Sequence, residues 1–111
     1  MISGFRKKSY REITAQELDA LLRADQALVV DVREVDEFAA GHIPGAINMP
    51  LSDFQPSRLP DPKGRQLVLN CLGGKRSAIA LEKCGAAQAA VDTHLTSGFS
   101  AWQAARLPIA R

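Results

Sequence analysis

The sequence predicts an α/β domain of three layers, in which a central, mostly parallel sheet of about five short strands carries helices on both faces. Two observations lead to this prediction. Short apolar runs rich in β-branched residues alternate with segments of helical period, and such strands pair in parallel through right-handed crossovers. The 111 residues suffice for one hydrophobic core but are too few for two ordinary domains. We expect residues 1–9 to form a solvated lead-in and residues 10–111 to form a single domain.

Composition and charge narrow the class of function. Apolar residues make up 46% and charged residues 23% of the chain, the usual globular mix, which argues against a disordered or fibrous protein. The net charge of +2 is too small to predict binding to nucleic acid or to an acidic membrane, although a small anion remains compatible with it. No apolar run approaches the ~20 residues of a membrane span, and the basic N-terminus lacks the apolar segment of a secretion signal. We therefore expect a reducing, cytoplasmic setting.

The first half of the domain is predicted to contain two pairs of a strand and a helix. Thr14, followed three residues later by Glu17, forms a capping box that marks the start of a helix. The nearly continuous apolar run at 27–32 is typical of a strand buried on both faces. Gly41 suits a left-handed residue after the end of a helix. The predicted elements are a strand at 10–13, a helix at 15–23, a strand at 27–32 and a helix at 34–40.

The second half begins with a turn through His42, Pro44 and Gly45. Ser52 is a plausible N-cap for the segment that follows, and Trp102 is predicted to anchor the core rather than to bind a ligand. The predicted elements are a short strand near 47–49, a capped segment at 51–59, an exposed turn at 60–64, a strand at 66–70, a helix after Gly74, a strand at 91–95, and a helix opened by Ser97 or Gly98 that stops before Pro108.

Cys71 is the predicted catalytic residue. It ends an apolar strand and is followed by two glycines, two cations and a helix-forming segment. A turn that opens a helix points several backbone N–H groups at one spot, and the helix dipole adds partial positive charge there. Because such an environment stabilises a thiolate relative to the thiol, Cys71 is expected to be nucleophilic at neutral pH.

The other cysteine and the histidines indicate no second centre. Ala78, Leu81 and Cys84 share one face of the predicted helix, so Cys84 is interpreted as a small buried hydrophobe rather than a redox centre. Two cysteines do not make a disulfide framework, and His42 and His94 have no metal-like spacing. We predict no metal and no cofactor. His42 could act as a general base, but its position in a turn favours a structural role.

Asp31 and Arg33 lie at the end of the predicted buried strand. An isolated buried charge is costly, so these two side chains are expected to be paired. An ion pair that braces the neighbouring loops is favoured over a direct catalytic role.

Four motifs occur in order along the chain. They are Asp31-Val32-Arg33 with Glu34 and Phe38, the turn Gly41-His42-Ile43-Pro44-Gly45-Ala46, Cys71 with Gly74, Arg76 and Ser77, and the closing Leu95, Gly98, Ala101 and Trp102. Together they resemble a single-domain rhodanese, a sulfurtransferase module, and the resemblance covers nearly everything from Tyr10 to Trp102. Three departures stand out: Ser97 and Gln88 replace common glycines, and Cys84 replaces a common leucine.

The resemblance implies a reaction. The Cys71 thiolate would attack the outer sulfur of a donor such as thiosulfate, release sulfite and hold the sulfur as a persulfide, which cyanide or a thiol then removes. Lys75 and Arg76 would attract the anionic donor, and Arg76 could make two hydrogen bonds to its oxygens. Because cations oppose the helix dipole here, an anionic group should offset them. Backbone N–H groups of the loop would cradle the persulfide; the loop is Leu72, Gly73, Gly74, Lys75 and Arg76.

Two alternatives remain open. Cdc25-like phosphatases resemble this family but have one more residue between the cysteine and the arginine; here four residues separate Cys71 from Arg76, which favours the compact sulfur-handling loop over a phosphatase or arsenate reductase. The other alternative is a sulfur carrier or regulatory interaction module that receives persulfide from a partner protein. The sequence specifies neither the physiological donor and acceptor nor the oligomeric state.

Overall fold

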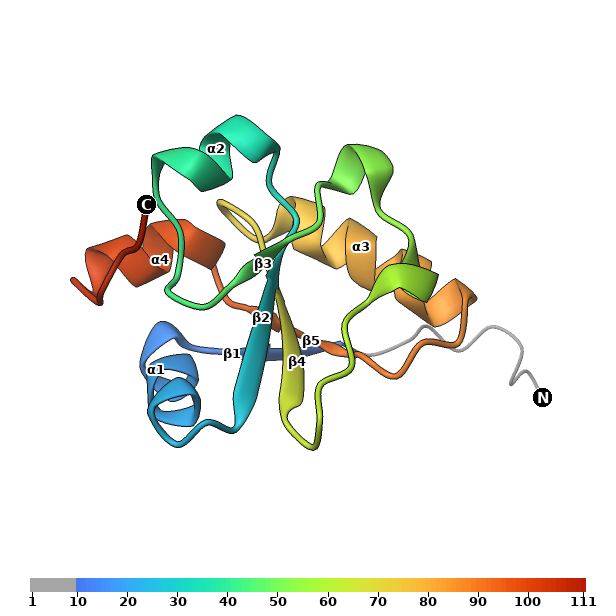
Figure 1. Ribbon diagram of the computed structural model, residues 1–111, viewed down its shortest axis with the longest axis horizontal. Helices are drawn as coiled ribbons and strands as arrows, with labels where there is room; N and C mark the ends of the chain where they lie inside the picture. Colours follow the sequence, from blue (N-terminus) through green and yellow to red (C-terminus); the bar gives the residue numbers. More distant parts are fainter. Residues whose placement is uncertain (1–9) are drawn as a thin grey trace.

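The computed structural model describes residues 10–111, and the predicted lead-in at 1–9 lies outside the described residues. The α/β prediction is confirmed: five strands form one sheet in the order β1-β5-β4-β2-β3, and every pair of neighbouring strands is parallel (Figure 1). In chain order the elements are β1 (Arg11–Ile13), α1 (Ala15–Arg23), β2 (Ala27–Asp31), α2 (Val35–Ala40), β3 (Ile47–Asn48), the 3-10 turns η2 (Leu51–Asp53) and η3 (Pro56–Arg58), β4 (Gln66–Asn70), α3 (Lys75–Ala86), β5 (Thr93–Leu95) and α4 (Gly98–Ala104).

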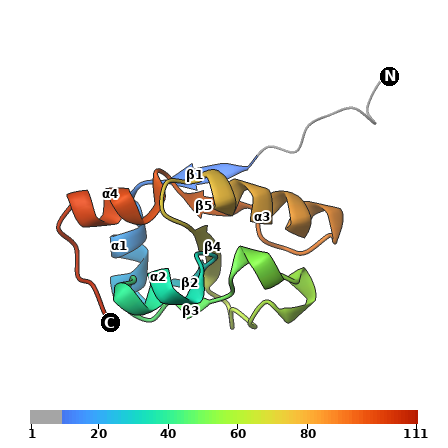
Figure 2. The ribbon, with the colours of Figure 1, turned by 90° about the horizontal axis from the view of Figure 1, so that it is seen from above.

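Helices cover both faces of the sheet, as the alternation of elements requires. Figure 2 shows α1 and α4 together on one side and α3 on the other. The core beneath α1 and α4 includes Leu18, Phe99 and Trp102. The core beneath α3 includes Leu81 and Cys84. The apolar run of β2 contributes to both, because alternate side chains of a strand point to opposite faces.

The strand order places a topological switch point between β2 and β4. The chain adds β2 and β3 in one direction along the sheet, and then returns through β4 and β5 in the other. Asp31 pairs with Asn70 at the carboxyl ends of β2 and β4, so both strands end at the same level. Ligands of open α/β sheets bind in the crevice outside such a point. Cys71 follows β4 directly there.

The start of α1 follows the predicted capping box. The Thr14 side chain accepts a hydrogen bond from the Glu17 amide at 3.1 Å, and the Thr14 amide donates to the Glu17 carboxylate at 2.8 Å. Both helix bounds agree with the prediction, and the first is signalled locally, because the cap and the first turn lie within four residues.

Two local predictions are wrong. Residues 51–59 form two short 3-10 turns rather than a helix capped by Ser52, because Pro56 has no N–H and restricts the residue before it. Instead, the Ser52 hydroxyl donates to the Glu34 carboxylate at 2.7 Å. Gly41 is not in the left-handed helical region; its φ of 158° and ψ of 136° extend the chain into an antiparallel bridge between His42 and Ala110.

Candidate functional site

The Cys71 sulfur accepts two backbone hydrogen bonds. Its side chain is buried, and Sγ lies 3.0 Å from the amide of Gly74 and 3.3 Å from the amide of Ser77. Gly74 is the N-cap of α3, in a left-handed conformation with φ 105°. A glycine has no side-chain oxygen to accept from the first turn of its helix, so the cysteine sulfur takes that place. Two backbone N–H donors, from Gly74 and Ser77, are thus aimed at the sulfur of Cys71.

The predicted cradle is partly different from the observed one. Of the predicted loop residues, Gly74 donates to the sulfur, while Leu72 and Gly73 form the exposed tip of the loop. Ser77, which the predicted set omitted, supplies the second amide. The missed signal was positional: Ser77 is the third residue of α3, and the amide at that position has no partner within its own helix.

Arg76 is held by a carboxylate of the protein itself. Its guanidinium makes two hydrogen bonds to Glu37 of α2, at 2.7 and 3.0 Å. The two guanidinium nitrogens that were predicted to bind a donor's oxygens thus donate to Glu37 in this structure. Glu37 is the anionic group expected to offset the cations at the start of α3. The hydrogen bonds from Arg76 lower the pKa of the Glu37 carboxyl to about 2.

Lys75 is the exposed cation of the loop. It is the first residue of α3, and no ion pair involves it in the part of the chain that the structure describes. Its ammonium therefore adds an exposed positive charge at the start of α3.

Asp31 and Arg33 form a buried ion pair beside the loop. The guanidinium donates to both carboxylate oxygens at 2.8 to 3.1 Å, and a further N–H donates to the carbonyl of Gly41 at 2.7 Å. The guanidinium also lies 4.3 Å from the ring centre of Phe99. These contacts join the end of β2 to the end of α2 and to α4, and a buried, fully bonded pair of this kind fixes geometry.

His42 lies in the turn after α2. Its Nδ1 is 2.8 Å from the carbonyl of Phe38, and the two rings stack with centroids 3.8 Å apart. Its backbone bridges to Ala110. These contacts hold the turn and the C-terminal segment together.

The N-terminus of α4 fixes the carbonyls of the loop. Phe99 donates its amide to the Cys71 carbonyl at 2.7 Å, and Ser100 donates to the Leu72 carbonyl at 3.0 Å. Gly98 is essential to this approach, since a Cβ there would lie 2.3 Å from the Cys71 carbonyl oxygen. The backbone around Cys71 is thus held from β4, α3 and α4 at once.

A cavity of about 260 Å³ opens beside the loop. Leu72, Phe99 and Ile109 contribute apolar walls, and Glu37 and Arg111 contribute charge. Among residues 10–111, no cluster of three or more His, Cys, Asp or Glu side chains could hold a metal ion.

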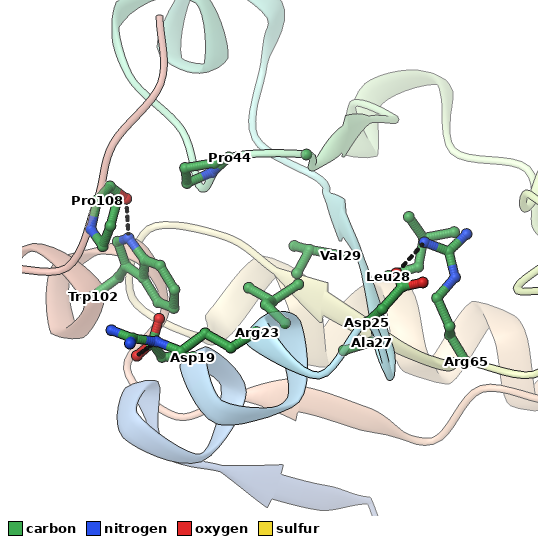
Figure 3. Close-up of a pocket in the computed structure, with 12 residues that line it drawn as sticks. Asp19, Arg23, Asp25, Ala27, Leu28, Val29, Pro44, Arg65, Trp102 and Pro108 are labelled. Carbon is green, nitrogen blue, oxygen red and sulfur yellow. Dashed lines mark hydrogen bonds and ion pairs between the residues drawn. The ribbon is translucent and has the colours of Figure 1, made fainter.

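A larger cavity of about 370 Å³ lies away from Cys71, at the amino ends of β2 and β4 (Figure 3). Trp102 contributes to its wall, with its indole N–H donating to the carbonyl of Pro108. The cations that line it are paired: Arg23 with Asp19, and Arg65 with Asp25. This cavity brings no nucleophile and no unpaired charge to a substrate.

Within the described part of the chain, no helix is long and apolar enough to cross a membrane.

Comparison with known proteins agrees with this geometry. The family model of the rhodanese-like domain matches residues 14–105. The chain is 40% identical over 96 residues to the uncharacterized protein slr1261 of Synechocystis, covering 86% of this chain and 54% of that one. It is 33% identical over 84 residues to the human thiosulfate:glutathione sulfurtransferase, covering 63% and 73%. A crystal structure of a rhodanese-related protein from Thermoplasma volcanium superposes with a TM-score of 0.76 at 28% identity, covering 91% and 98%.

The fold and the site define an α/β domain with a cysteine at the switch point of a parallel sheet, the edge at which such sheets bind ligands. The chain belongs to the rhodanese-like domain family. The chain spans about half the length of the Synechocystis relative, so the rhodanese-like domain can account for only part of that protein.

Proposed function

We propose that this protein is a sulfurtransferase that moves a sulfane sulfur through a persulfide on Cys71. The observation that carries the proposal is the pair of backbone amides, from Gly74 and Ser77, that donate to the Cys71 sulfur. In a persulfide these amides would hold the inner sulfur, and we expect other backbone N–H groups of the same turn to hold the negative charge of the outer sulfur.

The reaction has two balanced steps. In the first, the Cys71 thiolate attacks the outer sulfur of thiosulfate; a new S–S bond forms, the bond from sulfane sulfur to the sulfonate breaks, and sulfite leaves with the electron pair. In the second, cyanide or a thiolate attacks the outer sulfur of the persulfide, and the Cys71 thiolate leaves. Lys75 attracts the anionic donor, while the Arg76 pair with Glu37 holds the loop. A reducing cytoplasm would keep Cys71 available as a thiol.

The test is the formation of cyanolysable sulfur from thiosulfate. Wild-type protein is expected to form thiocyanate with turnover, and Cys71→Ser is expected to form none. Cys84→Ser is the matched control, because this second thiol lies in the core beneath α3 and its burial raises its pKa to about 11. Equal activity of the wild type and Cys71→Ser would overturn the proposal.

A second candidate is a sulfur carrier whose Cys71 receives its sulfur from a partner protein or from an organic persulfide. The apolar wall of the 260 Å³ cavity favours it, since thiosulfate has no apolar part to contact Leu72, Phe99 and Ile109. A carrier would gain one sulfur atom on Cys71 from a persulfide donor and none from thiosulfate. Hydrolysis of a generic aryl phosphate would instead indicate the phosphatase alternative.

A further inference from the structure

A chain of polar side chains leads away from Cys71 into the domain. The hydroxyl oxygen of Ser77 lies 3.6 Å from the Cys71 sulfur and 2.7 Å from Nδ1 of His94. On the other side of that ring, Nε2 lies 3.3 Å from a carboxylate oxygen of Glu12. Side chains from four places in the fold, β1, the end of β4, α3 and β5, therefore contact one another in succession.

Burial limits the groups that can accept a proton from the Cys71 thiol. Cys71, Ser77 and His94 are 1%, 0% and 6% exposed, whereas the Glu12 side chain is 58% exposed. A proton that leaves the thiol in such a place has few acceptors. The hydroxyl of Ser77 can pass its own proton to His94 as it accepts another, but it also has the Gly74 carbonyl within 3.1 Å. The contact of Ser77 with His94, at 2.7 Å, is the shorter of the two, and of these two partners only the imidazole can take up a proton.

We propose that His94 is a positioning residue that accepts the Cys71 proton through Ser77. This inference rests on the proposed function and deepens it. With a neutral ring protonated at Nε2, the Ser77 O–H points to Nδ1, and the Cys71 S–H donates to the Ser77 oxygen. When the thiolate forms, the S–H bond breaks, Ser77 takes that proton and gives its own to Nδ1. The Ser77 hydroxyl then donates back to the thiolate, and the imidazolium faces the Glu12 carboxylate.

Opposite charges make the arrangement self-consistent. Two charged groups outside this chain of Cys71, Ser77 and His94 face it: Glu12 on β1, whose carboxylate meets Nε2 of His94, and Arg76 on α3, whose charge interacts with Cys71. After the proton transfer, the thiolate and the imidazolium carry opposite charges, one on either side of the Ser77 hydroxyl. In this scheme His94 touches neither the sulfur donor nor the sulfur acceptor, and it affects the reaction through Ser77 alone.

The first experiment measures how fast iodoacetamide alkylates Cys71 as a function of pH, which requires no sulfur donor. Trypsin separates the two cysteines at Lys75, Arg76 and Lys83, so mass spectrometry follows Cys71 alone. His94→Asn is expected to slow alkylation at neutral pH about tenfold and to move the profile to higher pH, because an opposite charge is lost from beside the thiolate. Ser77→Ala should do the same, and the double variant should lose nothing more, since both act in one chain.

A smaller change is expected from the exposed end. Glu12→Gln should shift the profile in the same direction by less than His94→Asn, because water screens its charge. Asp92→Asn is the matched control. The Asp92 carboxylate lies next to β5 but accepts a hydrogen bond from the Thr93 hydroxyl, so this substitution should leave the pH profile of alkylation unchanged. A profile of folded His94→Asn that coincides with that of the wild type would overturn the proposal.

The second experiment leaves His94 in place, and so does not depend on the folding of the His94 variant. In Cys71→Ser the thiolate is absent, so NMR should show His94 becoming protonated at lower pH than in the wild type, by reciprocity. His42, the other histidine of the sequence, is the internal control and should titrate unchanged. An identical His94 titration in both proteins contradicts the coupling. If His94 and Cys71 prove coupled but thiosulfate yields no cyanolysable sulfur, the role of His94 stands and the sulfurtransferase proposal is refuted.

Discussion

Gly98→Ala is expected to damage the reactive loop more than any ordinary glycine substitution. At Gly98 the φ angle is 56°, and an added Cβ would lie 2.3 Å from the carbonyl oxygen of Cys71 and 2.7 Å from that of Leu72. Both are backbone atoms, which cannot rotate away. The α4 N-terminus must retreat from the loop, and the hydrogen bonds from Phe99 and Ser100 to these two carbonyls are lost.

The magnitude follows from these contacts. A left-handed alanine costs about 1 kcal/mol, and two buried hydrogen bonds cost about 1 kcal/mol each, so we expect about 3 kcal/mol of lost unfolding free energy. Gly64→Ala isolates the first contribution, because Gly64 has φ 85° with nothing within 4 Å of its Cβ position. It should cost about 1 kcal/mol.

Urea unfolding of the two variants measures this difference directly. The rate of Cys71 alkylation in the folded proteins gives the second readout, because a displaced loop no longer aims the Gly74 and Ser77 amides at the sulfur. Gly98→Ala should lose both stability and thiolate reactivity, and Gly64→Ala only a little stability. If the two variants were equally stable and equally reactive, the packing of α4 against the loop would not hold Cys71 in place.

Three further predictions concern the surroundings of the loop. The Glu37 carboxyl has a pKa lowered to about 2 from 4.5, so its pair with Arg76 stabilises the fold fully above pH 4.5 and is lost as the pH falls toward 2. Glu37→Gln should cost about 1 kcal/mol at pH 7, with both side chains one-third exposed and partly screened, and much less at pH 2 by urea unfolding. Ser97→Gly should raise the stability by about 1 kcal/mol, since Ser97 has φ 56° and makes no capping hydrogen bond; a lower melting temperature would contradict this. Lys75→Ala should raise the KM for thiosulfate several-fold at low salt and less at high salt; an unchanged KM would remove Lys75 from donor binding.

The features of this protein that are determined by residues close together in the sequence could be predicted. The capping box at Thr14 and the cysteine before a glycine turn are local signals, and the alternation of strands and helices determines the parallel sheet. The preference for glycine at position 97 has a local reason too, because the backbone there is left-handed, a conformation that glycine adopts most easily.

Side-chain partners across elements could not be predicted in this way. Arg76 meets Glu37 across 39 positions of sequence, because the fold brings the first turn of α2 next to the start of α3. His94 carried no motif of its own, and only the pairing of β5 with β1 and β4 places it between Glu12 and Ser77. An arginine side chain predicts a bidentate partner, either a carboxylate of the protein or an oxyanion of a ligand, but tertiary structure decides which of the two it meets.

The most direct test of a persulfide-forming Cys71 is the intact mass of the protein after incubation with thiosulfate, before and after cyanide. The account predicts an increase of one sulfur atom that maps to Cys71, disappears with cyanide as thiocyanate forms, and is absent in Cys71→Ser. An unchanged mass with thiosulfate and with an organic persulfide, or an added sulfur that persists in Cys71→Ser, would contradict it.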